Sequence, residues 1–353
     1  MVRSSVRRSF FPQSIVLLLL YFSSHAAQTD GLSAISNSHD HIHSVGTSHQ
    51  QALSKTLTIA RMQGAHTTGQ LLSKCTKESC KNKPNKTGVW LQPVGLRTNK
   101  YSSGSTPGFK SQARALVLGI DSKIKENLIL GSALGYGHGI MKFNLNAGKS
   151  HVYDTFLSLF GTWFGETWYM EGSLLGGLQK YHVARNTGTN NLFVFNHHTG
   201  YQLCPHLGGG YIFSMKEYQL RPYVSADYVY SSQAGHLDTG PGAPNVYIDQ
   251  SDSSMLRTEA GLNLSKKSDY GKFYSKLSLQ LAAVNKRPLK RGLIIASNGT
   301  SLEPSKTITT AFSPGIEASI VYEDGWSLSA FWIGEYAYQY TQQEVFVKFR
   351  KTF

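Results

Sequence analysis

The chain ends in an extended segment with two chemically different faces, Glu344-Val345-Phe346-Val347-Lys348-Phe349-Arg350-Lys351-Thr352-Phe353. Because alternate side chains of a strand point to opposite sides, one face carries Val345, Val347, Phe349 and Phe353, and the other carries Glu344, Lys348, Arg350 and Thr352. A strand of this kind, closed by an aromatic residue, is typical of a barrel wall between lipid and water. The same alternation also fits a half-buried strand of a soluble sheet, so the rest of the chain must separate the two.

Alternating segments recur along residues 88–353. Twelve are predicted as strands: 88–97, 111–121, 128–138, 150–163, 168–182, 198–213, 218–232, 252–265, 272–286, 306–321, 326–336 and 344–353. In 272–286, one face carries Leu277, Leu279 and Leu281, and the other carries Lys276, Ser278 and Gln280. The abundance of aromatic residues (19 Tyr, 17 Phe and 5 Trp) with 34 Gly agrees with a β-rich chain that makes many turns.

Connections between these segments alternate in length. Those at 122–127, 164–167, 214–217, 266–271 and 323–325 are short, whereas those at 98–110, 234–251 and 287–305 are long and polar. Outer-membrane barrels have short turns on the periplasmic side and long loops outside the cell. A soluble sandwich has no physical reason to sort its loops in this way. The sequence therefore predicts an all-β fold, a twelve-stranded antiparallel transmembrane β-barrel.

Two further groups of residues support a barrel. Aromatic residues near strand ends are expected at the lipid–water interface, namely Trp90, Trp163, Trp168, Tyr169, Trp326, Trp332 and Tyr336. The polar faces carry charges of both signs, which would be costly in a sandwich core but can pair or be hydrated in a lumen. These are Asp154, Glu171, Arg221, Asp227, Arg257, Glu259, Lys276, Glu317, Glu335, Lys348 and Arg350.

The amino terminus predicts export. Residues 1–26 resemble a signal peptide: Arg3, Arg7 and Arg8 precede the apolar run 15–22, and Ser24-His25-Ala26 offers a cleavage site. No later run approaches the ~20 apolar residues of a membrane-spanning helix. The predicted organisation is a signal peptide at 1–26, a tail and linker at 27–84, and the barrel at 85–353. The predicted location is the outer membrane of a Gram-negative bacterium.

The segment 27–84 offers little chemistry. Asp40 lies among four histidines, His39, His41, His43 and His49, but a solvated tail is the favoured interpretation, and no metal or cofactor is predicted. Residues 51–63 have helical spacing of Leu53, Leu57 and Ala60. Cys75 and Cys80 could close one small loop, and Cys204 is expected as a small apolar wall residue.

The net charge of +14 is scattered along the chain without a basic run interleaved with aromatics, so nucleic-acid binding is not predicted.

Several short segments of the region 85–353 resemble the carboxy-terminal β-domain of autotransporters. They are Gly88-Val89-Trp90, Gly119-Ile120-Asp121, Ile129-Leu130-Gly131-Ser132-Ala133-Leu134-Gly135-Tyr136, Arg221-Pro222-Tyr223-Val224 and the terminal Phe353. Each is short, but their order and overall span match that domain. Within the autotransporters, the stretch from Pro222 to Tyr230 and Lys286-Arg287-Pro288 resemble chlamydial polymorphic membrane proteins.

The resemblance implies a twelve-stranded barrel, a helix in its pore, which 51–63 would supply, and export of an upstream passenger. It also implies outer-membrane lipid, the β-barrel assembly machinery and periplasmic chaperones as partners. The chain departs from the family in two ways. Only about 60 residues separate signal and barrel, too few for a long β-helical passenger, and Lys351 stands where an apolar residue is expected. Near the interface a lysine can snorkel, so the strand is expected to tolerate it.

Three functions remain open from the sequence. The favoured one is a translocator barrel that exports or displays an amino-terminal segment and exposes surface loops. The alternative is a general porin or a surface adhesin barrel. An outer-membrane enzyme would need a carboxylate pair or a Ser-His group at one rim, and the residues weighed for it are His182, His197, His198, His206, His236 and Asp238. Scattered loop residues of this kind are common, so no catalytic residue is named and the chain is not expected to be an enzyme.

Overall fold

A computed structural model of the chain describes residues 87–102, 108–144, 148–186, 193–240, 246–290, 294–295, 301–302 and 308–353. The predictions for the signal peptide, the segment 27–84, its helix at 51–63, its histidines and Cys75 and Cys80 lie outside these residues. Among the described residues, no helix is long and apolar enough to cross a bilayer.

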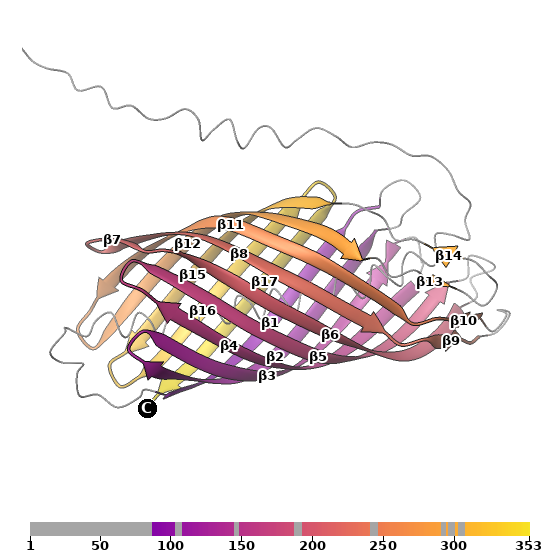
Figure 1. Cartoon of the computed structure of the whole chain (residues 1–353), viewed down its shortest axis with the longest axis horizontal. Coiled ribbons are helices and arrows are strands. Elements are labelled where there is room, and N and C mark those ends of the chain that lie inside the picture. Colours follow the sequence, from indigo (N-terminus) through magenta and orange to yellow (C-terminus); the bar gives the residue numbers. More distant parts are fainter. Residues whose placement is uncertain are drawn as a thin grey trace, which may run out of the picture. The chain divides into compact units, whose positions relative to one another are not determined.

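The described chain is built from strands. They are β1 (Thr87–Lys100), β2 (Phe109–Lys125), β3 (Leu128–Phe143), β4 (Gly148–Phe164), β5 (Trp168–Asn186), β6 (Phe193–Tyr211), β7 (Phe213–Met215), β8 (Tyr218–Gln233), β9 (His236–Asp238), β10 (Val246–Ile248), β11 (Ser251–Asp269), β12 (Phe273–Lys290), β13 (Ile294–Ile295), β14 (Ser301–Leu302), β15 (Thr309–Tyr322), β16 (Trp326–Ala337) and β17 (Tyr340–Thr352). Strands of 12 to 19 residues, tilted as Figure 1 shows, are long enough to cross a bilayer and extend beyond it.

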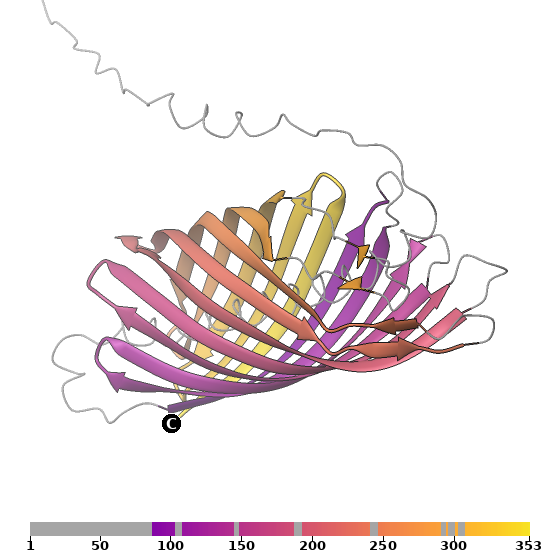
Figure 2. The same cartoon turned by 45° about the vertical axis from the view of Figure 1, so that its right-hand side comes forward.

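The sheet closes on itself. The first wall strand, β1, pairs antiparallel with β2 on one side and with the last strand, β17, on the other. On the far side of the barrel β8 pairs with β11, which completes the ring (Figures 1 and 2). Both β6 and β7 pair with β8 and are separated only by Ile212, so together they form one wall strand. The predicted twelve-stranded antiparallel barrel is confirmed.

Side chains alternate across this wall as the sequence predicts. In β12, Leu277, Leu279 and Leu281 are each at least half exposed on the outer surface, whereas Lys276 and Ser278 are buried on the inner side. In β17, Val345 and Phe349 face outward, and Glu344, Lys348 and Arg350 face inward. An apolar exterior with a polar interior is the pattern of a barrel in lipid.

The two rims differ as predicted. Consecutive wall strands are joined by tight turns at one rim, where Gly271 and Gly325 adopt positive φ angles that favour glycine. At the other rim most connections are longer, and two of them contain the small hairpins β9–β10 and β13–β14, whereas β16 and β17 are joined there by only Tyr338 and Gln339. Figure 1 shows these hairpins at the end of the barrel opposite the β7–β8 turn and the carboxy terminus. We call the two ends the turn side and the loop side.

Aromatic side chains mark the edges of the apolar exterior. Trp163, Trp168, Tyr211, Tyr322 and Trp326 lie on the outer face near the turn side, and Tyr136, Tyr201, Tyr228, Phe312 and Tyr336 lie on it toward the loop side. Between these rows the outer face is largely apolar, and we call it the lipid belt. Amphipathic rings at both edges of such a belt are expected at the headgroup level.

Three of the predicted interface residues lie elsewhere. Trp90 is 2% exposed and faces the lumen, because its neighbours Val89 and Leu91 take the outer face and alternation leaves the inner face to Trp90. The ring of Tyr169 likewise faces inward and packs with Tyr223. Trp332 is on the outer face but midway along β16.

The carboxy-terminal strand accommodates its unusual lysine. Lys351 is paired in register with Trp326, and its Nζ lies 4.9 Å from the centre of that indole ring. The same ammonium donates a hydrogen bond of 2.8 Å to the carbonyl oxygen of Asp324 in the adjacent turn. The charge therefore reaches the turn-side surface while the aliphatic stem lies along the wall, as expected of a snorkelling lysine.

Candidate functional site in the barrel lumen

The inner face of the barrel is rich in paired charges. Within the described residues, the buried charged side chains comprise nine carboxylates and seven cations: Asp121, Asp154, Glu171, Asp227, Asp238, Glu259, Glu317, Glu335, Glu344, Arg185, Arg221, Arg257, Lys276, Lys286, Lys348 and Arg350. They include every charge that the sequence placed on the polar strand faces. The near balance of signs allows most of them to be neutralised by one another.

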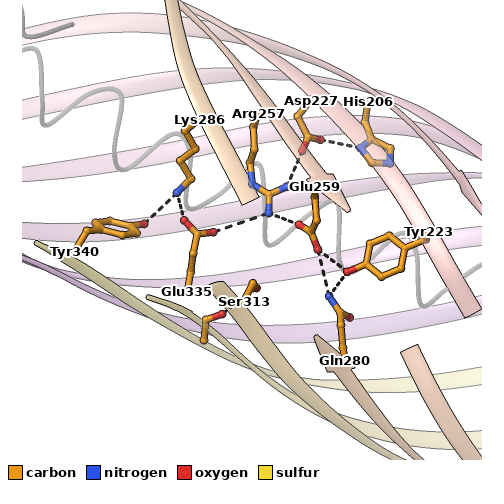
Figure 3. A network of polar contacts seen from close by, with 11 residues as sticks. His206, Tyr223, Asp227, Arg257, Glu259, Gln280, Lys286, Ser313, Glu335 and Tyr340 are labelled. Atoms are coloured by element: carbon orange, nitrogen blue, oxygen red, sulfur yellow. Dashed lines mark hydrogen bonds and ion pairs between the residues drawn. The ribbon is translucent and has the colours of Figure 1, made fainter. Parts of the chain in front are cut away.

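Arg257 on β11 is the centre of the largest network (Figure 3). Its Nη1 donates to Asp227 Oδ2 on β8 at 3.0 Å, and its Nη2 donates to Glu259 on the same strand. Nη2 also lies 3.9 Å from Glu335 Oε2 on β16. A planar guanidinium with several donors can serve three carboxylates at once. This one residue thus links strands that are far apart in sequence.

Two branches extend from Arg257 toward β6 and β12. His206 Nδ1 lies 2.7 Å from Asp227 Oδ1, so Asp227 bridges His206 and Arg257. On the other branch Tyr223 Oη donates to Glu259 Oε1 at 2.6 Å, and Gln280 Nε2 donates to Tyr223 Oη at 2.6 Å. Figure 3 shows these side chains pointing toward one another from the inner faces of their strands.

A third branch closes the network against the last strand. Lys286 on β12 forms an ion pair with Glu335 on β16, and its Nζ lies 3.3 Å from Tyr340 Oη on β17. The ammonium also lies 4.7 Å from the centre of the Tyr340 ring, within cation–π range. Contacts therefore run along the inner wall from β6 to β17, and they tie the late strands together near the loop side.

Separate pairs line the wall closer to the turn side. Lys276 Nζ donates to Glu317 Oε2 at 2.7 Å, and Arg350 on the last strand pairs with Asp121 on β2. Between them, Lys348 Nζ lies 4.2 Å above the Trp90 ring. The contacts of Arg350 and Lys348 reach across the β1–β17 seam, so they reinforce the pairing that closes the barrel.

The chemistry of this wall suits passage of polar chains. Opposite charges held close together keep most of their attraction for each other, which limits strong binding of any one passing ion or peptide. Hydrogen-bonding groups are present at many positions, so an extended polar segment can exchange water for wall contacts. Among the described residues, no group of three or more His, Cys, Asp or Glu is arranged to hold a metal ion.

The histidines weighed as catalytic candidates fall on both faces of the wall. His182 and His197 lie on the outer surface, and their ring centroids are 4.5 Å apart. His198 and His236 are buried on the inner side and stack at 4.2 Å between centroids. His206 lies in the Arg257 network. The wall separates the outer pair from the inner histidines, and His206 pairs with Asp227 whereas His198 stacks on His236, so these residues do not form one constellation.

The inner pair lies at the loop-side mouth of the lumen, beyond the lipid belt. Asp238 on β9 forms an ion pair with Arg185 on β5 and accepts a 2.7 Å hydrogen bond from Asn196. Burial lowers the pKa of His198 to about 3, with repulsion from His236 acting in the same direction, so both stacked rings stay neutral near pH 7. The group fastens the β9–β10 hairpin against the barrel wall.

Sequence reasoning placed the charged side chains on the correct face but missed part of the network. Tyr340 and Gln280 join it through hydroxyl and amide groups, and only the strand register shows that they reach their partners. Cys204 is 1% exposed among buried apolar residues, as expected. Alternation placed Gln280 on the polar face without its partners, and Tyr340 was missed because β17 begins before the predicted strand at 344–353.

Known proteins resemble this chain over most of the barrel. The family model described as Autotransporter beta-domain matches residues 89–331. The chain belongs to this family. The match covers all but the first two residues of β1 and ends within β16, so it includes the lumen wall described above except for part of the last hairpin.

Individual relatives agree with this assignment. A curated relative, the IgA-specific serine endopeptidase autotransporter of Neisseria gonorrhoeae, is 27% identical over 153 residues, which are 43% of this chain and only 9% of that protein. The translocator domain of the autotransporter NalP from Neisseria meningitidis has the same fold, with a TM-score of 0.62 at 20% identity over 84% of this chain and 97% of that one. The β domain of the Bordetella autotransporter BrkA gives 0.58 at 15% identity, covering 76% and 99% of the two chains.

The ion pair between Lys276 and Glu317 allows a test of how far paired charges stabilise this autotransporter β-domain. Replacing Lys276 by Met leaves a buried carboxylate without its closest cation, which is expected to lower the free energy of unfolding by about 3 kcal/mol. The double variant Lys276→Met, Glu317→Leu removes both charges and should recover at least half of that loss. Urea titration of the barrel in detergent micelles, followed by Trp fluorescence, measures both values. A Lys276→Met barrel as stable as the wild type would show that this pair is already screened by water.

Proposed function

We propose that the barrel exports residues 27–84 through its lumen and displays them at the cell surface. In this proposal residues 1–26 are removed as a signal peptide, 27–84 are the exported segment, and 85–353 form the translocator domain. The observation that carries it is the closed barrel whose inner wall, among the described residues, carries nine buried carboxylates and seven buried cations beside an apolar cluster, in a chain of the autotransporter β-domain family.

The composition of the exported segment suits this wall. Residues 27–84 contain six Lys or Arg and three Asp or Glu, whereas the buried charges of the barrel are nine carboxylates and seven cations. The segment is thus slightly basic and the lumen slightly acidic, which favours entry without a strongly bound intermediate. The helix expected at 51–63 would then lie in the pore at the end of export.

The relatives favour this function over a porin or an adhesin, because the matched family is one of translocator barrels. The endopeptidase named in the curated relative belongs to a protein of which this chain covers 9%. We infer that the barrel itself performs no catalysis, since its polar groups pair with one another along the wall rather than converging on a substrate site.

Assembly is the second part of the proposal. We infer that the β-barrel assembly machinery recognises the end of β17, where Phe353 is 74% exposed and its amide donates to the Thr87 carbonyl at 2.9 Å. The aromatic ring therefore stands outside the wall beside the seam at which the barrel closes. Periplasmic chaperones would hold the apolar strands until they insert.

Removal of the terminal ring tests this inference. The variant Phe353→Ser keeps the backbone contact to Thr87 and is expected to reduce the amount of heat-modifiable barrel in outer-membrane fractions several-fold. The matched control is Tyr338→Ser at the loop side, which is also an exposed aromatic ring and should leave assembly unchanged. Refolding of both purified variants into detergent at wild-type yield would show that the defect is one of recognition. Equal membrane levels of Phe353→Ser and wild type would contradict it.

Export is tested by the position of an epitope. A tag inserted between Asp30 and Gly31 is expected to bind antibody on intact cells, because the proposal carries this segment outside. The same tag inserted in the turn after Asp269 should bind only after the outer membrane is permeabilised. If the amino-terminal tag is hidden in intact cells and exposed in permeabilised ones, the segment stays in the periplasm and the barrel does not export it.

A further inference from the structure

The outer surface of β1–β6 carries a concentrated positive charge on the loop side of the lipid belt. Strand register places the residues in rows across neighbouring strands. One row contains Arg114, His138, Tyr153 and Lys180, the next contains Ile140, His151, His182 and His197, and a third contains Lys110, Lys142 and Lys149. With Arg97 on β1, six cations and four histidines share this face. We call it the basic rim patch.

Acidic residues are missing from this part of the outer surface. Between Thr87 and Met215 the sequence has only five, Asp121, Glu126, Asp154, Glu166 and Glu171. Three of them face the lumen, and Glu126 and Glu166 lie in turn-side connections at the opposite rim. Within the described part of the chain, the cations of the basic rim patch therefore have no carboxylate beside them on their own face, in contrast to the paired charges of the lumen.

The lipid belt fixes the level at which the basic rim patch lies relative to the bilayer. The row directly below it contains Leu116, Tyr136, Thr155, Leu178 and Tyr201. Two residues along a strand correspond to about 6–7 Å, so Arg114, His138 and Lys180 lie one side-chain row above the aromatic edge. That is the depth of lipid headgroups and their phosphates, and flexible lysines can reach along it.

The rest of the wall lacks an equivalent surface. On the described parts of β8, β11, β12 and β15–β17, the outward charged residues toward the loop side are Arg287, Lys290 and Asp252. Lys290 Nζ lies 3.3 Å from Asp252 Oδ2 and is thereby partly neutralised. The basic rim patch is thus confined to one side of the barrel.

We propose that the basic rim patch binds phosphorylated lipid headgroups of the outer leaflet, and that it binds them more tightly as the pH falls. Charge complementarity, continuity with the lipid belt and the absence of neighbouring carboxylates favour this occupant. Arg and Lys donate charge-assisted hydrogen bonds to phosphate oxygens. Neighbouring strands are about 5 Å apart, and the cations are spread over β1–β5, so the patch is wide enough to contact both phosphates of a lipid A headgroup.

Histidines make the patch sensitive to pH. His138 Nε2 lies 3.4 Å from His151 Nδ1, His138 stacks on Tyr153 at 4.6 Å, and His182 packs against His197. Burial lowers the pKa of His151, and the nearby His138, Lys149 and His182 lower it further. For His182 burial, His197 and Lys180 act in the same direction.

These two rings are therefore neutral near pH 7 and take up protons in acid. The groups that surround them on adjoining strands are the other two histidines and the cations Lys110, Arg114, Lys142, Lys149 and Lys180, all of which oppose protonation. A bound phosphate attracts the protonated rings and offsets the repulsion that these cations exert on them. By linkage, the affinity of the patch for phosphate therefore rises as His151 and His182 protonate.

The experiment uses the full chain in neutral detergent micelles and a fluorescent, bis-phosphorylated lipid A, with binding followed by anisotropy at about pH 7.5 and pH 5.5. The triple variant Lys142→Gln, Lys149→Gln, Lys180→Gln is expected to bind about tenfold more weakly or worse. The matched control Lys272→Gln, Arg287→Gln, Lys290→Gln removes three exposed cations elsewhere and should bind within about twofold of wild type. Heat-modifiable gel mobility confirms that each variant is folded.

A second variant isolates the histidines. Replacing His138, His151, His182 and His197 by Gln is expected to keep the affinity at pH 7.5 and to abolish the several-fold tightening at pH 5.5. Equal binding by wild type and the lysine triple variant would overturn the proposal. So would complete displacement by inorganic phosphate, which would indicate a site for soluble anions, or loss of binding in EDTA, which would indicate a metal-bridged site.

Discussion

The hydrogen-bonding demand of the backbone in lipid is the constraint on which this structure depends. A strand edge exposed to hydrocarbon would leave a row of amide and carbonyl groups without partners, so a membrane sheet must close. Here closure depends on the pairing of β1 with β17, which joins the first described strand to the end of the chain. The Arg350–Asp121 ion pair and the Lys348–Trp90 contact lie at this seam and support it from inside.

Closure of the sheet then determines where polar side chains can lie. Because side chains alternate, every residue that is not turned to lipid is turned to the lumen, and a wall of twelve strands presents a large inner surface. Part of this surface is apolar, in the cluster that contains Trp90, Phe156 and Phe346. The rest is polar, and its charges would bind passing ions or peptides if they were unpaired. The network around Arg257 limits such binding by joining charges from β8, β11 and β16. We propose that translocation depends on this pairing.

Much of this fold could be predicted from the sequence, because the alternation of polar and apolar residues has a period of two residues and recurs in twelve segments. It assigned the faces of β12 and β17 correctly, along with the short and long connections. It failed for Trp90 and Tyr169, where position near a strand end was given more weight than alternation. Partners across the lumen could not be predicted, since the contact of Arg257 with Glu335 depends on the register of several strands. The basic rim patch was missed for the same reason: its residues are spread from Arg97 to His197 and meet only in the folded wall.

The most direct test of the account is a cysteine scan along β12 in a chain whose Cys75, Cys80 and Cys204 are replaced by Ser. Single cysteines at positions 277 to 282 are exposed, in lipid bilayers, to a charged, water-soluble thiol reagent. We predict modification at 280, which is partly accessible on the inner side, slower modification at 278 and 282, which are buried on that side, and protection at 277, 279 and 281, which face lipid. Uniform modification, or protection with the opposite parity, would contradict a membrane barrel with a wet, polar lumen.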